Sequence, residues 1–346
     1  MVSRYDNKDD LLVTPEVQNA APTGMSWPAA TRQLDSSPTA WRAGEAAEYR
    51  GLLTAAQSLT RFGERLALFP QDVGERFALL SVSAMLHGEG VWLRPDRIAL
   101  YRALRIGADD AGRDLARANW AIRRLSGSSL AGPLDGVQGF LGRNTVQSSQ
   151  AMGREFPGDD RPQRGDAEAL GDQWVAAVEG VQDLHPLTQG AFAFHRWREQ
   201  ELTPFDEILE PGVAVMRIGA VGLAPFLPQA EGRNIGRLPG GGTVRDRLRC
   251  FYSAVETGSL KALMDLGRLT DWQARAVQQT ACLSGRIPPL LIDALLRLPV
   301  VSAELVAATL SCSRPAARRN LDLLVARGLI REVTGQDRYR FWTVQL

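Results

Sequence analysis

The sequence has little cysteine and histidine, which limits the chemistry it can support. The three cysteines are Cys250, Cys282 and Cys312. They lie far apart and give neither a metal-ligand spacing nor a disulfide framework, which fits a reducing cytoplasm. The three histidines, at 87, 185 and 195, are too dispersed for a zinc site without added carboxylates. We therefore expect no metal, no disulfide and no cofactor.

Long apolar runs are also missing. No uncharged apolar segment approaches the roughly 20 residues that a membrane-spanning helix needs. The first ten residues, MVSRYDNKDD, lack the apolar core of a signal peptide. We expect a cytoplasmic protein with no membrane partner.

Charge is nearly balanced overall but unevenly distributed. The chain of 346 residues carries a net charge of +1. Residues 286–346 contain nine Arg and five acidic residues, a net charge of +4, whereas the remainder carries −3. A small basic C-terminal piece on a slightly acidic body indicates contact with nucleic acid.

Composition divides the chain into five segments and predicts a mainly α fold. Residues 1–40, rich in Pro, Thr, Ser and Asp, predict an extended N-terminal arm. Residues 41–145 predict a helical subdomain, 146–166 a flexible linker, 167–284 the second half of the helical body, and 285–346 a C-terminal module.

Within the body, apolar residues recur at three- and four-residue steps, as in amphipathic helices. Two separate helical runs are expected before the C-terminal module, at 243–267 and 270–285. The Gly-rich stretch GRNIGRLPGGG lacks the Gly-Lys-Ser/Thr of a P-loop and follows no strand signal, so we interpret it as a flexible loop. Four tryptophans are expected in the core: Trp92, Trp120, Trp174 and Trp197.

The C-terminal module predicts three helices followed by a β-hairpin. Ser302 and Ser313 stand where they cap the second and third helices, and Pro315 falls in the first turn of the third. Gly328 ends that helix. LIREV, a turn at TGQD, and RYRFWTV then form the hairpin. This pattern resembles winged helix-turn-helix domains, over about the last 60 residues.

Helical geometry gives the third helix of this module two faces. Ala317, Leu321 and Leu324 share one face and are expected to pack on the other helices. In winged helix-turn-helix domains the opposite face enters the major groove, where the Arg fork suits guanine. Arg338 and Arg340 alternate along the last strand and are expected to reach phosphate. The candidate DNA-binding residues are Ser313, Arg314, Arg318, Arg319, Arg338 and Arg340. The alternative is a winged helix that binds protein, with these arginines forming a solvated face.

The stretch from His185 to Ala193 resembles the catalytic loop of Fic proteins, His-x-Phe-x-acid-Gly-Asn-Gly-Arg. His185 stands at the position of the base and Gly190 matches. Leu187 replaces the Phe, and Gln189 replaces the metal-binding acid. The last three motif residues are replaced by Ala191, Phe192 and Ala193. Without a carboxylate for magnesium or an anion cradle, His185 is a poor catalyst of phosphoryl transfer. We therefore interpret it as a residue that begins a helix beside Pro186. A Fic-type nucleotidyl (AMP) transferase using His185 remains the alternative.

Residues 83–88, SAMLHG, resemble the inhibitory helix of some Fic proteins, with His87 in place of the Glu. Residues 45–346 as a whole resemble a bacterial family with a degenerate Fic-like body and a C-terminal winged helix-turn-helix, in which the ending EVTGxxRYRxW recurs. The resemblance implies a non-enzymatic DNA-binding protein, in our interpretation a transcriptional regulator. Its partner would be double-stranded DNA. The body would serve for homodimerisation, or for sensing a small-molecule or protein effector.

Overall fold

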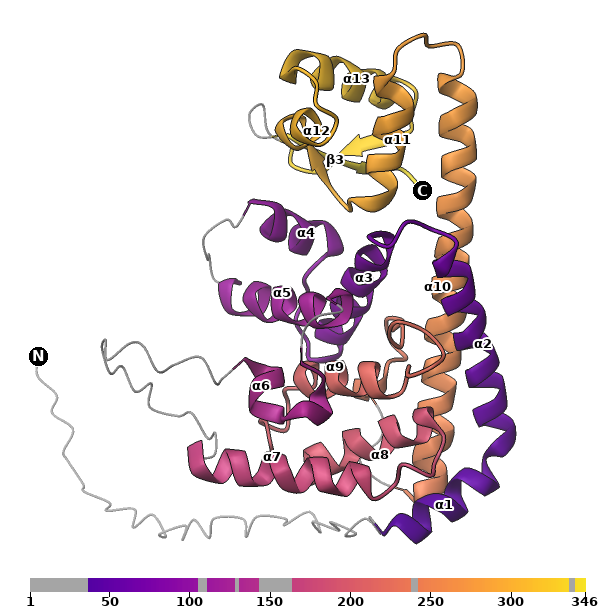
Figure 1. Ribbon diagram of the computed structural model, residues 1–346, viewed down its shortest axis with the longest axis vertical. Coiled ribbons are helices and arrows are strands. Elements are labelled where there is room, and N and C mark those ends of the chain that lie inside the picture. The colour runs from indigo at the N-terminus through magenta and orange to yellow at the C-terminus, as the bar shows by residue number, and fades with distance from the viewer. Residues whose placement is uncertain (1–36, 105–110, 128–130, 143–163, 238–241, 336–339) are drawn as a thin grey trace, which may run out of the picture. The chain divides into compact units, whose positions relative to one another are not determined.

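The computed structural model describes residues 37–104, 111–127, 131–142, 164–237, 242–335 and 340–346. It is mainly helical with a small three-stranded sheet near the C-terminus, as predicted (Figure 1). No helix in these ranges is long and apolar enough to cross a membrane. The predicted arm (1–40) lies outside the described residues up to residue 36, and so does most of the predicted linker (146–166).

The first half of the helical body contains six α-helices and one 3-10 turn within the described ranges. They are α1 (Pro38–Ala47), α2 (Tyr49–Ala67), α3 (Val73–Gly88), α4 (Pro95–Leu104), α5 (Gly112–Ser126), η1 (Pro133–Asp135) and α6 (Val137–Leu141). The first helix begins within the predicted arm because Ser37 caps it and Pro38 sets its first turn.

The second half of the body contains α7 (Arg164–Glu179), α8 (Pro186–Glu199), α9 (Leu209–Ile218), η3 (Ile235–Arg237) and α10 (Val244–Thr280). The two helical runs expected around Gly267 form one continuous helix of 37 residues. The prediction of a break was therefore wrong. A single Gly lowers helix propensity by only about 1 kcal/mol, and Leu266 and Leu269 on either side of it are buried.

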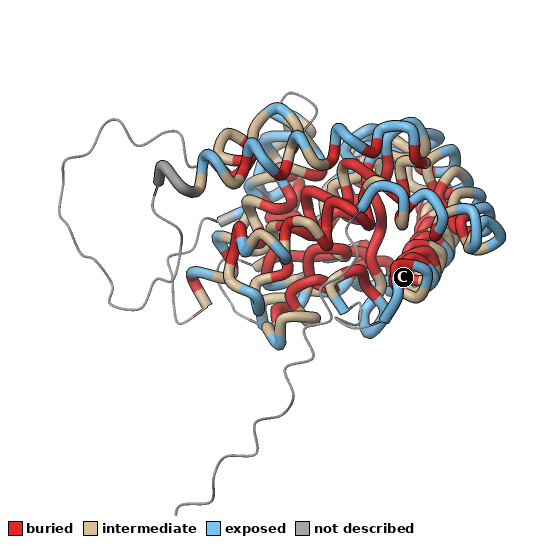
Figure 2. The backbone as a smooth tube through the Cα atoms, turned by 90° about the horizontal axis from the view of Figure 1, so that it is seen from below, coloured by how far each residue is buried: buried red, intermediate tan, exposed pale blue. Residues whose placement is uncertain are grey.

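Helices α2 and α10 lie side by side and run in the same direction (Figure 1). A Cβ on Gly51 of α2 would stand 3.5 Å from the Tyr252 ring of α10, and one on Gly44 of the preceding helix α1 would stand 2.9 Å from the Val244 side chain. Figure 2 shows buried segments gathered in the interior and exposed segments along the outer surface. The core of the body includes Trp174 and Trp197 as predicted, but Trp92 is 76% exposed, contrary to expectation.

The predicted flexible loop is packed in its first part. The Asn234 side chain is buried, donates to the Ala84 carbonyl over 2.8 Å, and accepts from the Gly236 amide. These bonds hold η3 on α3. Residues 238–241 lie outside the described residues.

The C-terminal module contains α11 (Ile287–Arg297), β1 (Val301–Ser302), α12 (Ala303–Thr309), α13 (Arg314–Ala326), β2 (Ile330–Glu332) and β3 (Phe341–Val344). The strands are antiparallel in the order β1-β3-β2, with Trp342 opposite both Val301 and Glu332. The predicted hairpin is confirmed, but β1 was not foreseen because a two-residue strand has no detectable period.

The module is joined to the body by buried polar contacts. The Arg76 guanidinium of α3 donates to the carbonyls of Leu295 and Leu298, each at 2.8 Å. Burial lowers the pKa of Arg76 to about 10, so it stays protonated at neutral pH. The Trp272 indole of α10 donates to the Leu329 carbonyl over 2.7 Å.

Candidate nucleic-acid interface

Helix α13 begins as the sequence predicts. The Ser313 hydroxyl accepts a hydrogen bond from the Ala316 amide at 3.3 Å, and Pro315 lies in the first turn. Helix α12 begins in the same way, with Ser302 accepting from the Leu305 amide at 3.1 Å. Gly328, with φ of +66°, follows the end of α13 in the left-handed conformation that favours glycine. The predicted caps are confirmed, and they fix where α13 starts and ends.

The two predicted faces of α13 are also confirmed. Ala317, Leu321 and Leu324 are buried, with at most 1% of their surface exposed. Ser313, Arg314 and Arg319 are exposed. Burial of the first face therefore turns the N-terminal half of the other face toward solvent.

The exposed arginines differ in whether their side chains form ion pairs. Arg314 forms an ion pair with Glu304 of α12, although 67% of its side chain is exposed. The Arg319 side chain makes no hydrogen bond or ion pair within the described part of the chain. Arg319 thus presents an unengaged guanidinium, whereas Arg314 would have to leave a carboxylate to bind another anion.

Arg318 connects α13 to the sheet. Its guanidinium forms an ion pair with Asp322 at 2.9 Å and lies 5.1 Å from the centre of the Trp342 ring. Arginine over an indole face is a favourable cation–π arrangement. The contacts support the packing of Trp342 and leave Arg318 half-buried, so it is less available than the sequence predicted.

The hairpin carries the other two candidate arginines, Arg338 and Arg340. Arg338 lies outside the described residues. Arg340 precedes β3, and its Nε donates to Glu332 of β2 at 2.6 Å, while its guanidinium lies 5.4 Å from the Trp342 ring centre. Arg340 is therefore paired with a cross-strand carboxylate, and its contact with phosphate stays a prediction.

Comparison with known families identifies this region. Residues 288–345 match a family described as an HTH DNA-binding domain. No curated protein sequence matches the chain. The matched residues run from the start of α11 to the end of β3, so the chain carries a C-terminal helix-turn-helix domain of the DNA-binding type. The match does not reach the Fic-like body, for which the loop motif remains a resemblance in sequence.

Within the helix-turn-helix domain, three acidic partners were missed by the sequence analysis: Glu304, Asp322 and Glu332. The Arg318–Asp322 pair has the i,i+4 spacing of helix ion pairs and was visible in the sequence. The other two pairs depend on how α12 and β2 pack, which no short-range pattern gives.

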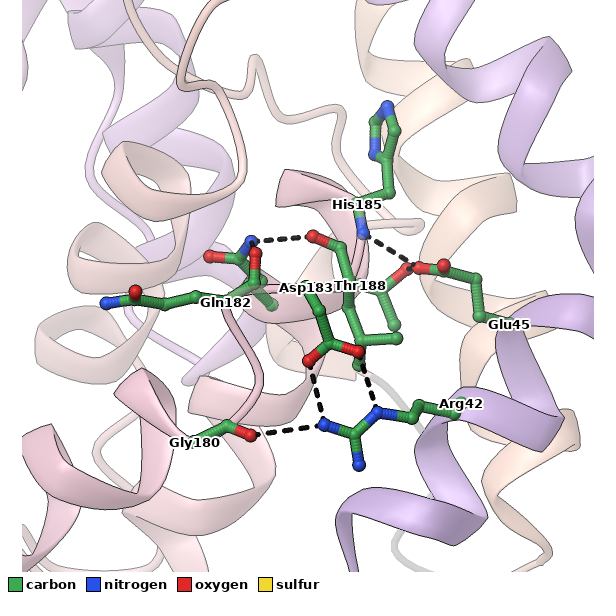
Figure 3. A network of polar contacts seen from close by, with 9 residues as sticks. Arg42, Glu45, Gly180, Gln182, Asp183, His185 and Thr188 are labelled. Atoms are coloured by element: carbon green, nitrogen blue, oxygen red, sulfur yellow. Dashed lines mark hydrogen bonds and ion pairs between the residues drawn. The ribbon is translucent and has the colours of Figure 1, made fainter.

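The His-Pro stretch has a structural role. His185 is the N-cap of α8, and its Nδ1 accepts from the Leu187 amide at 3.1 Å. Its own amide donates to Glu45 Oε2 at 3.0 Å (Figure 3). Burial lowers the pKa of His185, with Glu45 opposing the shift, so the ring is a neutral hydrogen-bond acceptor near pH 7. The interpretation of His185 as a helix-start residue is confirmed.

Most of the residues that follow His185 in α8 are buried. Gln189 donates to the Leu184 and Gln182 carbonyls, at 2.6 and 3.2 Å. Residues 190–195 are all buried in α8, and Phe192 meets Trp41 edge-on with ring centres 5.3 Å apart. The residues that replace the last three of the Fic motif, Ala191, Phe192 and Ala193, are thus buried in the helical body.

Proposed function

We propose that this chain is a DNA-binding regulator of transcription that places α13 in the major groove. The observation that carries the proposal is the exposed N-terminal half of α13, with Arg314 and Arg319 pointing to solvent inside a domain of the DNA-binding type. Thirteen residues make a helix about 20 Å long, enough to lie in the groove with its first turns at the base edges.

The arginines of the domain would bind DNA in different ways. Arg319 is positioned for a bidentate contact to a guanine edge or a phosphate without losing an existing partner. Arg314 and Arg318 would exchange Glu304 and Asp322 for phosphate oxygens on binding. Ser313 lies at the same end of the helix, where phosphate contacts set the register of a recognition helix.

The proposal is tested by fluorescence anisotropy of the full chain with a labelled duplex, between 50 and 200 mM salt. We expect affinity to fall steeply with salt, and the Arg314→Ala/Arg319→Ala double variant to lose most of its binding. The matched control, Arg50→Ala/Arg65→Ala, removes the same charge from exposed positions of α2 and should bind as the wild type does. Equal binding by both double variants would refute the assignment.

Protein binding by the winged helix is the second candidate. It is favoured by the pairing of Arg314 and Arg318 with acidic residues, which reduces the positive potential of the face. A salt-insensitive and weak association with every duplex would support it over DNA binding.

We further propose a homodimer, because one small domain gives limited affinity and two half-sites add their contacts. Sedimentation of the chain with a duplex carrying an inverted repeat is expected to give two chains per duplex. One chain per duplex at saturation would contradict this proposal.

A further inference from the structure

The helical body contains a large open cavity that the DNA-binding function does not use. Its volume is about 1180 Å³, and among the described residues it is lined by α2, α3, α4, α5, α9 and the loop 221–226. Small-molecule sites usually measure roughly 300–1,000 Å³. The cavity is therefore large enough for an organic ligand.

On one side of the cavity, two arginine side chains have no ion pair with a described carboxylate. Arg123 of α5 is exposed, and its side chain has no hydrogen bond or ion pair to any residue that the structure describes. Arg217 of α9 donates to the carbonyls of Arg124 and Gly127, at 2.7 and 3.5 Å, and to no described carboxylate. The pKa of Arg124 is lowered by burial and by repulsion from Arg123 and Arg217. An anion would relieve this repulsion, and the Arg fork binds planar oxyanions in two-point contacts.

The rest of the lining includes apolar, acidic and other polar residues. Leu66 and Phe226 are buried residues of the wall, and Val221 adds an exposed apolar side chain at the rim. The acids of the lining, Asp72 and Glu75, belong to α3 and its N-cap. A ligand with an apolar body and an anionic group would thus be oriented with the anion toward α5 and α9.

The cavity is connected to the helix-turn-helix domain by two short paths. Glu75 lines the cavity and forms an ion pair with Arg102 at 2.9 Å, and the next residue is Arg76, which holds the Leu295 and Leu298 carbonyls of the domain. Arg102 also lines the cavity, and its helix α4 carries Asp96, which pairs with Arg331 of β2 at 2.9 Å.

We propose that the cavity binds a small organic anion between Arg123 and Arg217, with its apolar body against Leu66 and Phe226. Occupancy changes how α3 and α4 contact the helix-turn-helix domain, because the ligand fills a cavity lined by Glu75 of α3 and Arg102 of α4. The binding part stands on the cavity alone, whereas the effect on DNA rests on the proposed function.

The binding part is tested with 1-anilinonaphthalene-8-sulfonate and its uncharged analogue N-phenyl-1-naphthylamine. Fluorescence titration of the full chain is expected to show saturable binding of one sulfonate probe per chain. Arg123→Gln should weaken the sulfonate at least fivefold and leave the uncharged probe unchanged, since Arg123 is exposed and its loss spares the fold. Arg50→Gln, an exposed Arg of α2 outside the cavity, is the control and should change neither. No saturable binding, or equal sulfonate affinity in wild type and Arg123→Gln, would overturn the site.

The coupling part is tested by measuring duplex affinity with and without a saturating amount of the sulfonate probe. We expect a severalfold shift in the wild type that Arg123→Gln abolishes, and by linkage the same shift in probe affinity when DNA is added. A duplex affinity that is the same with and without the probe would overturn the coupling. A chain that binds the probe but no duplex would refute the DNA-binding function and leave the anion site standing.

Discussion

The arginines of α13 contribute differently to the stability of the fold, and the free energy of unfolding of single variants measures the difference. Arg318 forms an ion pair with Asp322 and lies over Trp342, whereas the side chain of the neighbouring Arg319 has no hydrogen bond or ion pair among the described residues. We expect Arg318→Ala to lower the free energy of unfolding by roughly 1 kcal/mol, from a partly exposed ion pair and a cation–π contact. Arg319→Ala should leave stability unchanged. Urea unfolding of the two variants compares them directly, and equal losses would contradict these roles.

The environment of His195 predicts how the stability of the fold depends on pH. Its Nδ1 lies 2.9 Å from Nη1 of Arg247, and its pKa is lowered to about 3 by burial, then by the charges of Arg247 and Arg198. In the unfolded chain a histidine takes a proton near pH 6.5, whereas folded His195 stays neutral. Stability should therefore fall from pH 6.5 toward pH 3, by about 1.4 kcal/mol per pH unit from this residue alone.

The check is urea unfolding at pH 7.0, 6.0 and 5.0 for His195→Asn and for His87→Asn. The slope contributed by His195 should vanish in His195→Asn and persist in His87→Asn. If the His195 variant keeps the full slope of the wild type, its neutral state is not what couples stability to pH.

At the scale of the elements, α10 contains two glycines that differ in whether a larger side chain would fit. A Cβ on Gly267 would meet nothing within 4 Å, whereas one on Gly258 would stand 2.0 Å from the Pro228 carbonyl oxygen. Gly267→Ala should raise stability by about 0.5–1 kcal/mol, since it removes conformational freedom from the unfolded chain. Gly258→Ala should lower it by more than about 2 kcal/mol, because backbone must move. Thermal unfolding of both variants tests the pair, and a destabilised Gly267→Ala would mean that α10 is not continuous there.

Many elements of the helix-turn-helix domain could be predicted from the sequence, because the residues that define them interact with close neighbours in the chain. Ser302 and Ser313 act on amides three residues away, and the spacing of Ala317, Leu321 and Leu324 follows from helical geometry. The features that the sequence did not indicate depend on contacts distant in sequence. Strand β1 exists only by pairing with β3, and Arg340 is engaged only because Glu332 lies across the sheet. Of the candidate site, the position of α13 was predictable but the ion pairs that restrain its arginines mostly were not.

At the scale of the whole molecule, Arg76 joins the body to the helix-turn-helix domain. Removing its guanidinium leaves the Leu295 and Leu298 carbonyls without their buried donor, at a cost of about 2–3 kcal/mol. Arg76→Met should therefore speed hydrogen exchange of the α11 amides while sparing the first half of α10. The control Arg331→Met breaks only the exposed pair with Asp96 and should have a smaller effect. Equal protection of α11 in wild type and Arg76→Met would show that other contacts hold the domain.

The central claim is that α13 reads duplex DNA, and selection from a random duplex library by the purified full chain tests it most directly. The account predicts enrichment of a defined sequence by the wild type and by Arg50→Ala/Arg65→Ala, with none by Arg314→Ala/Arg319→Ala. Enrichment that survives the loss of both α13 arginines, or no enrichment by the wild type at low salt, would contradict it.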